Sequence, residues 1–324
     1  MSDAAMRLGW WLSSEEHDPR QLIEQSVLAE HSGFRTAMIS DHLLPWVRSQ
    51  AHAGHVWTTI GAIAQAADEL EVGTGVVAMI NRTHPITAAH AAATAAILLE
   101  GRFFLGVGTG ERLNEQPFGR RWPGAGERRE CLQEAIDVIR QVWQGGNVNF
   151  RGKHWRVENL RLLERPASPP PIHVAVSGKR SAAMAAKSGD GIIAVTPDAR
   201  LVDAFRGSGG VGPCIGQLHV SLAATMDAAL ENAWDSWPNG AVPPALLTEL
   251  ARPKHFEAVA ESAGRDTIRA SVVCATDATP VINAIDRFAG SGYGTIYLHQ
   301  VGPDQRRLAD VASSELLPHY NGER

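Results

Sequence analysis

The sequence predicts one (β/α)8 barrel, a TIM barrel, extending over residues 1–324. Two observations predict it: short apolar runs alternate with helix-periodic stretches along the whole chain, and no linker-like segment divides the chain. The expected strands are residues 7–12, 35–39, 71–77, 102–107, 172–176, 190–195, 217–224 and 295–299. A doubly wound sheet is the runner-up, because Gly106-Val-Gly-Thr-Gly110 resembles a dinucleotide-binding turn. The barrel is favoured because the last glycine of that fingerprint is replaced by Glu111.

Helices are expected after each of the first four strands. Residues 19–32 have apolar side chains at helical spacing, and Gly33 follows where a helix commonly ends. Residues 56–70 and 85–99 are alanine-rich helical stretches. Residues 127–143 form the most regular amphipathic pattern in the chain, with an apolar face made by Leu132, Ala135, Ile136, Ile139 and Val142.

The second half departs from strict alternation in two places. Residues 148–150 and 154–157 are short strand-like runs around Arg151-Gly-Lys153, which predicts an inserted β-hairpin. A short helix is expected over residues 181–188. The long stretch between residues 224 and 295 is predicted to be helical, with a break at Pro238-Asn-Gly240.

Composition excludes several classes of function. The 324 residues carry a formal charge of −5 without runs of like charge, so neither a nucleic-acid nor a membrane partner is expected. The first residues lack the pattern of a signal peptide, and no apolar run reaches membrane-spanning length. Three separated cysteines and scattered histidines suggest no disulfide framework and no metal site. A cytoplasmic protein is therefore expected.

Chemically active side chains follow the predicted strands. In a barrel of this kind, the carboxyl ends of the strands meet at one rim, which carries the active site. The residues expected there are Glu15, Asp41, His42, Trp46, Gly75, Val76, Thr109, Gly110, Glu111, Asn114, Ser177, Gly178, Lys179 and Arg180. This set exceeds what surface decoration requires, although any single member has a structural explanation.

Two of these turns are ambiguous when taken alone. Ser177-Gly-Lys-Arg180 lies between a strand and a helix, where free N–H groups and a cation suit an anion such as phosphate. Small residues also suit any tight strand-to-helix turn. Gly75-Val76 would let the backbone approach a flat ring closely, but a glycine in a strand more often marks a bulge.

Several motifs together resemble the luciferase-like flavin and deazaflavin barrels. They are Ser40-Asp-His-x-x-Pro-Trp46, Phe104 to Glu115, Trp122-Pro123 and Glu127-Arg128 at the start of a long helix. Within that superfamily the whole chain is most similar to the glucose-6-phosphate dehydrogenase group that uses coenzyme F420, an 8-hydroxy-5-deazaflavin. The resemblance implies a luciferase-like barrel, hydride transfer to F420 and a homodimer.

The resemblance also assigns catalytic roles. His42 would take the hydroxyl proton of an alcohol as hydride moves to C5 of the deazaflavin. Trp46 would shape the reacting centre, Glu111 would protonate the reduced ring or hold its N1 side, and Glu15 would polarise the pocket. These roles agree with the need of alcohol oxidation for a base that titrates near neutrality.

The remaining residues are assigned to cofactor binding by the same resemblance. Gly75-Val76 lies where the family has a bulge with a strained peptide bond behind the ring. Ser177, Gly178, Lys179 and Arg180 would hold the phosphate of the tail. The other expected cofactor contacts are Asp41, Thr109, Gly110 and Asn114.

One departure from the group concerns the substrate. The sugar-phosphate enzymes place a lysine just after the sixth strand, where this chain has Thr196-Pro-Asp198. An aspartate would repel a dianionic phosphate. The expected substrate is therefore an alcohol that is not a sugar phosphate. Two alternatives stay open: an FMN-dependent monooxygenase of the same fold, and a flavin-binding barrel without catalytic activity.

Overall fold

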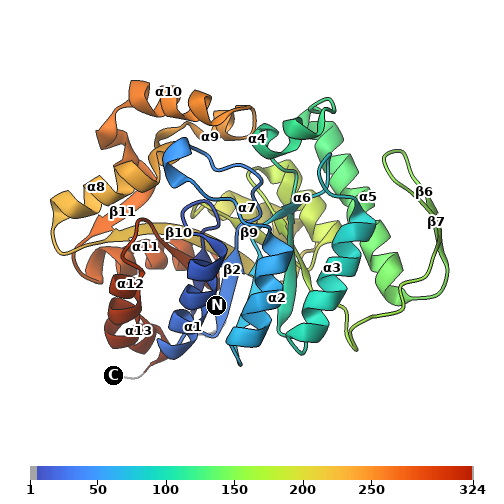
Figure 1. The fold of residues 1–324 in the computed structure, drawn as a ribbon, viewed down its shortest axis with the longest axis horizontal. Coiled ribbons are helices and arrows are strands. Elements are labelled where there is room, and N and C mark those ends of the chain that lie inside the picture. Colours follow the sequence, from blue (N-terminus) through green and yellow to red (C-terminus); the bar gives the residue numbers. More distant parts are fainter. Residues whose placement is uncertain (1–5, 323–324) are drawn as a thin grey trace.

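The computed structural model describes residues 6–322 and contains a closed barrel of parallel strands (Figure 1). Around the ring each strand pairs with the next, and the last pairs with the first. The order is β1 (Arg7–Leu12), β2 (Thr36–Ile39), β3 (Glu71–Thr74), β5 (Phe103–Gly108), β8 (Ile172–Ala175), β9 (Gly191–Ala194), β10 (Cys214–Leu222) and β12 (Thr295–Gln300). These are the eight strands expected from the sequence, so the prediction of a (β/α)8 barrel is confirmed.

Helices cover the outside of this ring (Figure 1). They include α1 (Pro19–His31), α2 (Val56–Ala66), α3 (Pro85–Leu98), α5 (Ala125–Gln144), α6 (Lys179–Ser188), α7 (Ala199–Gly207), α11 (Thr279–Gly290), α12 (Gln305–Val311) and α13 (Leu317–Asn321). Local chemistry explains where they begin. Asp18 caps α1 by accepting from the backbone N–H groups of Arg20 and Gln21, with Pro19 in the first turn.

The third predicted strand is interrupted. Strand β3 ends at Thr74, and β4 (Val77–Ala78) resumes the pairing with β5. The Gly75-Val76 peptide bond between them is cis. Thr74 Oγ1 donates to the carbonyl of Gly106 at 2.8 Å and accepts from its N–H at 2.9 Å. A Cβ on Gly106 would lie 1.9 Å from the Thr74 carbonyl oxygen, so only glycine allows this approach.

Strand β11 (Val272–Ala275) corrects the prediction of a continuous helical stretch between residues 224 and 295. It pairs with His219–Leu222 of β10, whereas β9 pairs with Cys214–Gly216. Because β12 occupies the other edge of β10, β9 and β11 share one edge of this long strand. A four-residue apolar run within alanine-rich sequence is too short to be distinguished from a turn of helix.

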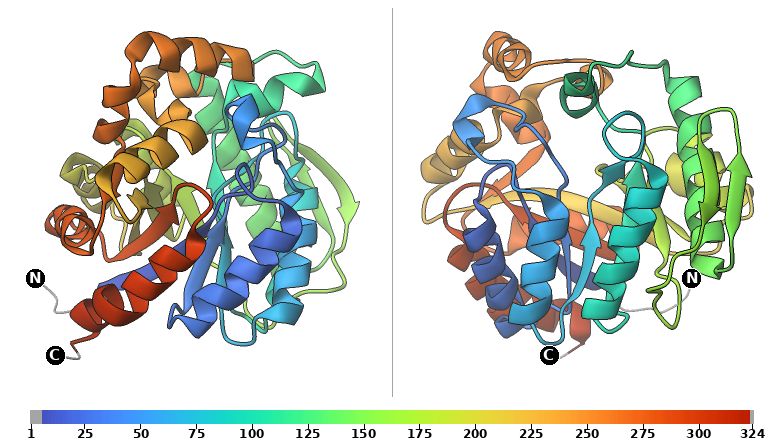
Figure 2. Two further views of the ribbon diagram at one scale, coloured as in Figure 1. Left: turned by 60° about the vertical axis from the view of Figure 1, so that its left-hand side comes forward. Right: turned by 45° about the vertical axis from the view of Figure 1, so that its right-hand side comes forward.

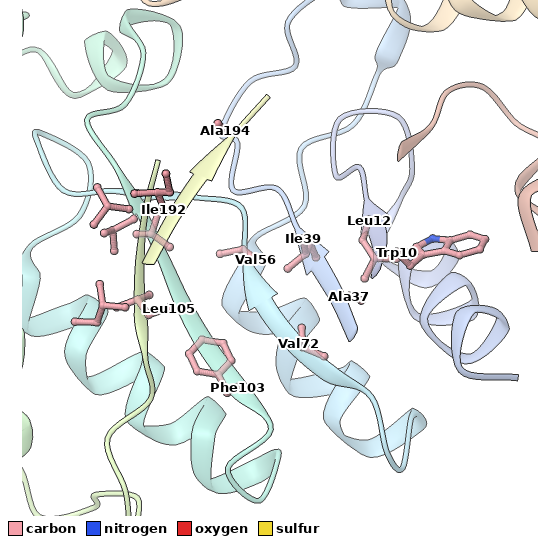
Figure 3. Close-up of a cluster of buried hydrophobic side chains, with 14 of the residues drawn as sticks. Trp10, Leu12, Ala37, Ile39, Val56, Val72, Phe103, Leu105, Ile192 and Ala194 are labelled. Atoms are coloured by element: carbon pink, nitrogen blue, oxygen red, sulfur yellow. The ribbon is translucent and has the colours of Figure 1, made fainter. Parts of the chain in front are cut away.

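Alternating side chains build two apolar layers. Trp10, Leu12, Ala37 and Ile39 face the surrounding helices, as Figure 3 shows. The residues between them point into the barrel and form a separate interior cluster: Trp11, Met38, Phe104, Ile193, Ile215 and Tyr297. The interior of the barrel is therefore filled, and ligands are restricted to its ends.

The segment between β10 and β11 forms a cap over the carboxyl ends of the strands (Figures 1 and 2). It contains α8 (Met226–Ser236), α9 (Pro244–Leu247) and α10 (Pro253–Ala263), with 3-10 turns at Pro238–Ala241 and Arg265–Ala270. At the other side of the molecule, β6 (Val148–Arg151) and β7 (Arg156–Leu160) form the expected hairpin. Among residues 6–322, no helix has the length and apolar character required to cross a membrane.

Candidate active site

His42 lies at the rim of the barrel, between carboxylates from two other strand ends. Its Nε2 atom is 3.4 Å from Oε1 of Glu15, which follows β1, and 3.6 Å from Oε1 of Glu111, which follows β5. The side chains of His42 and Glu15 are 10% and 2% exposed. Strong charge-assisted hydrogen bonds are about 2.7–2.9 Å long. Nε2 is therefore held only loosely by either carboxylate.

Glu15 is kept ionised by its surroundings. Burial raises its pKa, but attraction to His42, a hydrogen bond from Ser40 and further weaker contacts outweigh burial, so the pKa falls below its usual value. Its Oε2 atom accepts from the hydroxyl groups of Ser40 at 2.5 Å and Ser13 at 3.2 Å. The result is a fixed negative charge beside His42.

The other nitrogen of His42 has a partner for either tautomer. Nδ1 lies 3.3 Å from the Leu44 carbonyl oxygen, which accepts a proton from it, and 3.0 Å from Nδ2 of Asn114, which can donate to it. Asn114 Oδ1 accepts from the N–H groups of Leu43 and Leu44, both at 2.8 Å, and this fixes the orientation of the amide. His42 can therefore hold or release a proton at Nε2 without losing its partner at Nδ1.

Asn114 has contacts other than those implied by the resemblance, which placed it against the cofactor. The residue is 1% exposed, and its amide nitrogen donates to Oε1 of Glu111 at 2.7 Å. It lies in the short helix α4 (Arg112–Glu115), directly after the β5 turn. Asn114 therefore connects the histidine to the second carboxylate from within the protein.

Trp46 joins the site to the cap. Its ring centroid is 4.7 Å from that of His42 and 5.3 Å from that of Phe256 on α10. Apolar side chains of the cap pack on the loop after β2 and on α4; they are Val242, Leu247, Leu250, Phe256 and Val259, against Leu44, Trp46, Val47 and Leu113. The cap therefore holds the Trp46 ring, which is the apolar group beside His42.

Asp41 is paired with a residue that the sequence analysis missed. Arg82 donates from Nη1 to Oδ1 of Asp41 at 3.0 Å and from Nη2 to Oδ2 at 2.5 Å. The Arg82 Nε atom lies 3.8 Å from Oε1 of Glu115, whose side chain is fully buried. Burial raises the pKa of Glu115, although the Arg82 and Asn81 amides and the guanidinium oppose this. The Asn-Arg-Thr-His sequence around Arg82 carries no pattern that would have identified it.

The residues expected around the cofactor lie on neighbouring strand ends. Val76 packs on the interior cluster from above and is partly exposed, as are Gly75, Thr109 and Gly110. Gly110 has φ +66°, and a Cβ there would lie 2.9 Å from the side chain of Ala78. The ends of β3 and β5 therefore form a close-packed surface, and the side chain of Val76 is its apolar part.

The cationic turn is at the start of α6, which begins at Lys179, two residues earlier than expected. Lys179 and Arg180 are exposed, and a Cβ added to Gly178 would meet no atom within 4 Å. Ser181 Oγ accepts from the N–H groups of Ser177 and Gly178 at 3.3 and 3.2 Å. Open space in front of free N–H groups and two cations suits an anionic group.

Asp198 is neutralised locally. It caps α7, and its Oδ1 and Oδ2 atoms accept from Nε and Nη2 of Arg200 at 2.9 and 2.8 Å. The hydrogen bond from Arg200 holds the pKa of Asp198 below its usual value. The repulsion expected between Asp198 and a phosphate is therefore offset by the arginine, and the charge argument against a sugar phosphate is weaker than the sequence suggested.

Comparison with known proteins supports the resemblance. The chain is 36% identical to the F420-dependent hydroxymycolic acid dehydrogenase of Mycobacterium tuberculosis, over 97% of this chain and 88% of that protein. It is 31% identical to the F420-dependent glucose-6-phosphate dehydrogenase of Segniliparus rotundus, over 97% of both chains. The solved structure of an F420-dependent secondary alcohol dehydrogenase in complex with an F420-acetone adduct superposes with a TM-score of 0.89, at 26% identity, covering 95% of this chain and 97% of that one.

The family assignment rests on the sequence as well as the fold. The sequence model of the luciferase-like monooxygenase family matches residues 5–294, which include the loops that carry His42, Glu111 and the start of α6. The chain belongs to the luciferase-like monooxygenase family.

Proposed function

We propose that this protein is an F420-dependent dehydrogenase that oxidises a neutral alcohol. The observation that carries the proposal is His42, with a loosely held Nε2 atom between Glu15 and Glu111 and the Trp46 ring beside it. Relatives that cover almost the whole chain are named as F420-dependent dehydrogenases, and these names support the choice of cofactor.

The described residues fit a deazaflavin. F420, when bound, supplies C5 as the hydride acceptor. The partly exposed Val76 and the Gly75-Val76 backbone offer a flat apolar support for a ring, and Gly178, Lys179 and Arg180 offer space and positive charge for a phosphate. Asp41 is already held by Arg82, so its place in the site is fixed before ligand arrives.

His42 acts as the base. With its Nδ1 proton donated to the Leu44 carbonyl, Nε2 has a free lone pair that takes the hydroxyl proton as hydride leaves the carbinol carbon. The imidazolium that forms is stabilised by Glu15 and Glu111. Trp46 and the cap exclude water, which strengthens these interactions.

An apolar cap favours an alcohol without a phosphate. The side chain that lies beside His42 is Trp46, and the leucine, valine and phenylalanine side chains of the cap pack behind it. Lys254 is the only lysine after Lys187; it is exposed, and it lies two positions along α10 from Phe256, which places it on another face of the helix. The arginine on Asp198 is already engaged.

The test combines binding with kinetics. Calorimetric titration of the purified apoprotein should show F420 binding at least ~10-fold more tightly than FMN, about 1.4 kcal/mol. Decay of the deazaflavin absorbance should be faster with simple secondary alcohols than with glucose 6-phosphate or glucose. Equal or tighter binding of FMN would favour the monooxygenase. A higher kcat/KM for glucose 6-phosphate than for every neutral alcohol would refute the proposed substrate class.

A further inference from the structure

A second set of acid–base side chains lies behind Glu15. Glu16 Oε2 is 2.5 Å from Nε2 of His299, at the end of β12, and their side chains are 4% and 1% exposed. His299 Nδ1 is 2.7 Å from Nδ1 of His219 on β10. Both nitrogens of His299 thus have a hydrogen-bond partner. Glu16, His299 and His219 form a row of titratable groups that extends over the adjacent strands β1, β12 and β10.

The three side chains Glu16, His299 and His219 are connected to His42, the proposed base. The hydroxyl of Ser13 donates to Oε2 of Glu15 at 3.2 Å. Ser13 also adjoins the Glu16 carboxyl group and lowers its pKa. Oε1 of Glu15 is 3.4 Å from Nε2 of His42. A continuous path of proton-exchanging groups therefore leads from His42 through Glu15 and Ser13 to Glu16.

The pKa values of the adjacent carboxyl groups of Glu15 and Glu16 are shifted in opposite directions. Burial raises the pKa of Glu16 to about 7, against the opposing effects of His17, the Gly302 amide and Ser13, while Glu15 raises it further. Burial lowers the pKa of His299 to about 3 and also lowers the pKa of His219. Of two neighbouring carboxyl groups, Glu15 stays ionised and Glu16 binds a proton near neutrality.

Two further histidines, His17 and His52, lie near Glu16. His17 follows it in the chain, with burial lowering the pKa of its imidazole, and His52 faces His17 from the loop before α2. The backbone N–H of Gly302 donates to Oε1 of Glu16 at 3.0 Å. Neither His17 nor His52 hydrogen-bonds to Glu16, His299 or His219 within residues 6–322, so His17 acts on Glu16 through its charge alone.

We propose that Glu16 stores the proton that His42 removes from the substrate, a role that rests on the proposed dehydrogenase function. The substrate O–H bond breaks and its proton binds Nε2 of His42 as hydride leaves the carbon. His42 then passes this proton to Glu15. The Glu15 carboxyl group then turns by half a rotation, so that its protonated oxygen faces Ser13. It gives this proton to the oxygen of Ser13 as the hydroxyl proton of Ser13 moves to Glu16.

After this series of proton transfers, each intermediate group has returned to its starting protonation state. His42 is again neutral, Glu15 is anionic, Ser13 is unchanged and Glu16 is a carboxylic acid. His299 and His219 hold the Glu16 carboxyl in place and stay neutral. Glu16 acts through Glu15 and does not touch the substrate, so it is a positioning residue for the proton.

The pH profile of the holoenzyme tests this role. With a secondary alcohol and F420, kcat of the wild type should rise as pH increases through about 7, because only ionised Glu16 accepts a proton. Glu16→Gln keeps the shape but cannot ionise, so it should lose that rise, with kcat at pH 8 lowered by up to ~10²-fold. His55→Gln is the control, because this exposed histidine before α2 is not among the groups that act on Glu16, and the variant should keep the rise.

A second variant covers the possibility that Glu16→Gln does not fold. His219→Gln loosens the hold on His299 at a partly exposed position, and it should shift the pH at which kcat rises while preserving F420 affinity. The proposal is overturned if Glu16→Gln keeps the wild-type profile. It is equally overturned if a folded His219→Gln has the midpoint of the wild type.

A measurement on the apoprotein separates this inference from the proposed function. Infrared titration should show a protonated-carboxyl band that disappears as pH rises through about 7 and is missing in Glu16→Gln. An apoprotein with this band but no F420-dependent alcohol oxidation would refute the proposed dehydrogenase and leave the titrating pair established. Absence of the band in an active wild-type enzyme would refute the proton store alone.

Discussion

The contacts of His42 serve both of its protonation states. Its Nδ1 atom meets a carbonyl acceptor and an amide donor, and its Nε2 atom faces two carboxylates at 3.4 and 3.6 Å. A histidine that only caps a loop needs one partner. This residue has partners for the neutral imidazole and for the cation, which is the arrangement that the proposed general base needs.

Replacing His42 should therefore separate catalysis from binding. We expect His42→Ala to lower kcat by about 10²–10⁴-fold, the usual contribution of a positioned acid–base group, with little change in F420 affinity. Stopped-flow absorbance and calorimetry give the two quantities. His55→Ala, an exposed histidine in the following loop, is the control. A His42→Ala enzyme with most of its kcat would show that the residue is structural.

The ion pair of Arg82 is buried and not on the surface. It neutralises buried Asp41 and lies beside buried Glu115. Arg82→Met should lower the free energy of unfolding by about 3–5 kcal/mol, because an unpaired buried charge remains. Chemical denaturation of the apoprotein measures this, and the double variant Arg82→Met/Asp41→Asn should recover part of the loss.

The matched control is Arg48→Met. Arg48 also forms a bidentate pair, with Glu257, but its side chain is 78% exposed. We expect a cost of at most ~1 kcal/mol. Equal costs for the two variants would show that burial does not decide the role of Arg82.

At the scale of elements, the start of α6 is where an anion would be held. Gly178 has extended backbone and no atom within 4 Å of an added Cβ. The Gly178→Ala substitution should leave stability unchanged but occupy the space in front of the helix. We expect at least ~10-fold weaker F420 binding by calorimetry, about 1.4 kcal/mol.

Gly61→Ala provides the comparison. A Cβ there also meets nothing within 4 Å, and the residue lies in the middle of α2, away from the α6 turn. It should retain wild-type affinity. Unchanged F420 binding in Gly178→Ala would place the phosphate elsewhere on the rim.

At the scale of the whole molecule, buried Glu16 makes stability depend on pH. Its pKa is raised from 4.5 to about 7 on folding, so the unfolded chain loses this proton first. The contribution of Glu16 is favourable below about pH 4.5 and is lost as pH rises to about 7. His299, with a lowered pKa, contributes in the opposite direction as pH falls below 6.5.

Glu16→Gln removes the first effect. Relative to the wild type, the variant should gain stability on going from pH 5 to pH 8, on the order of 2–3 kcal/mol for a shift of this size. Guanidinium denaturation at the two pH values provides the measurement. A difference that stays constant or falls with pH would contradict the raised pKa.

Most strands of the barrel could be predicted from local sequence, and the element that was missed has a physical explanation. Apolar runs bounded by polar turns identified every strand of the ring, because each strand is buried on both faces. Strand β11 escaped because Val272–Ala275 is short and lies in alanine-rich sequence. The motifs around His42 and Glu111 identified the loops of the candidate site, since these loops carry distinctive residues in a fixed order.

Partners brought together only by the fold could not be predicted. Arg82 reaches Asp41 across 41 positions, and His299 reaches Glu16 across 283. Neither pair has a local signature, and the barrel closure that joins β12 to β1 creates the second. The ion pair between Asp198 and Arg200 was accessible from sequence, but its strength depends on how the start of α7 orients both side chains.

The position of the cap has a consequence for how this protein can diversify. Everything that covers the rim from α8 to α10 comes from one uninterrupted segment between β10 and β11, whereas His42, Glu15 and Glu111 come from the first half of the chain. A single exchange of residues 223–271 with the equivalent part of a relative would replace the cover of the rim and leave His42, Glu15 and Glu111 in place. Recombination at these two points is therefore a direct route to a changed substrate under the proposed function.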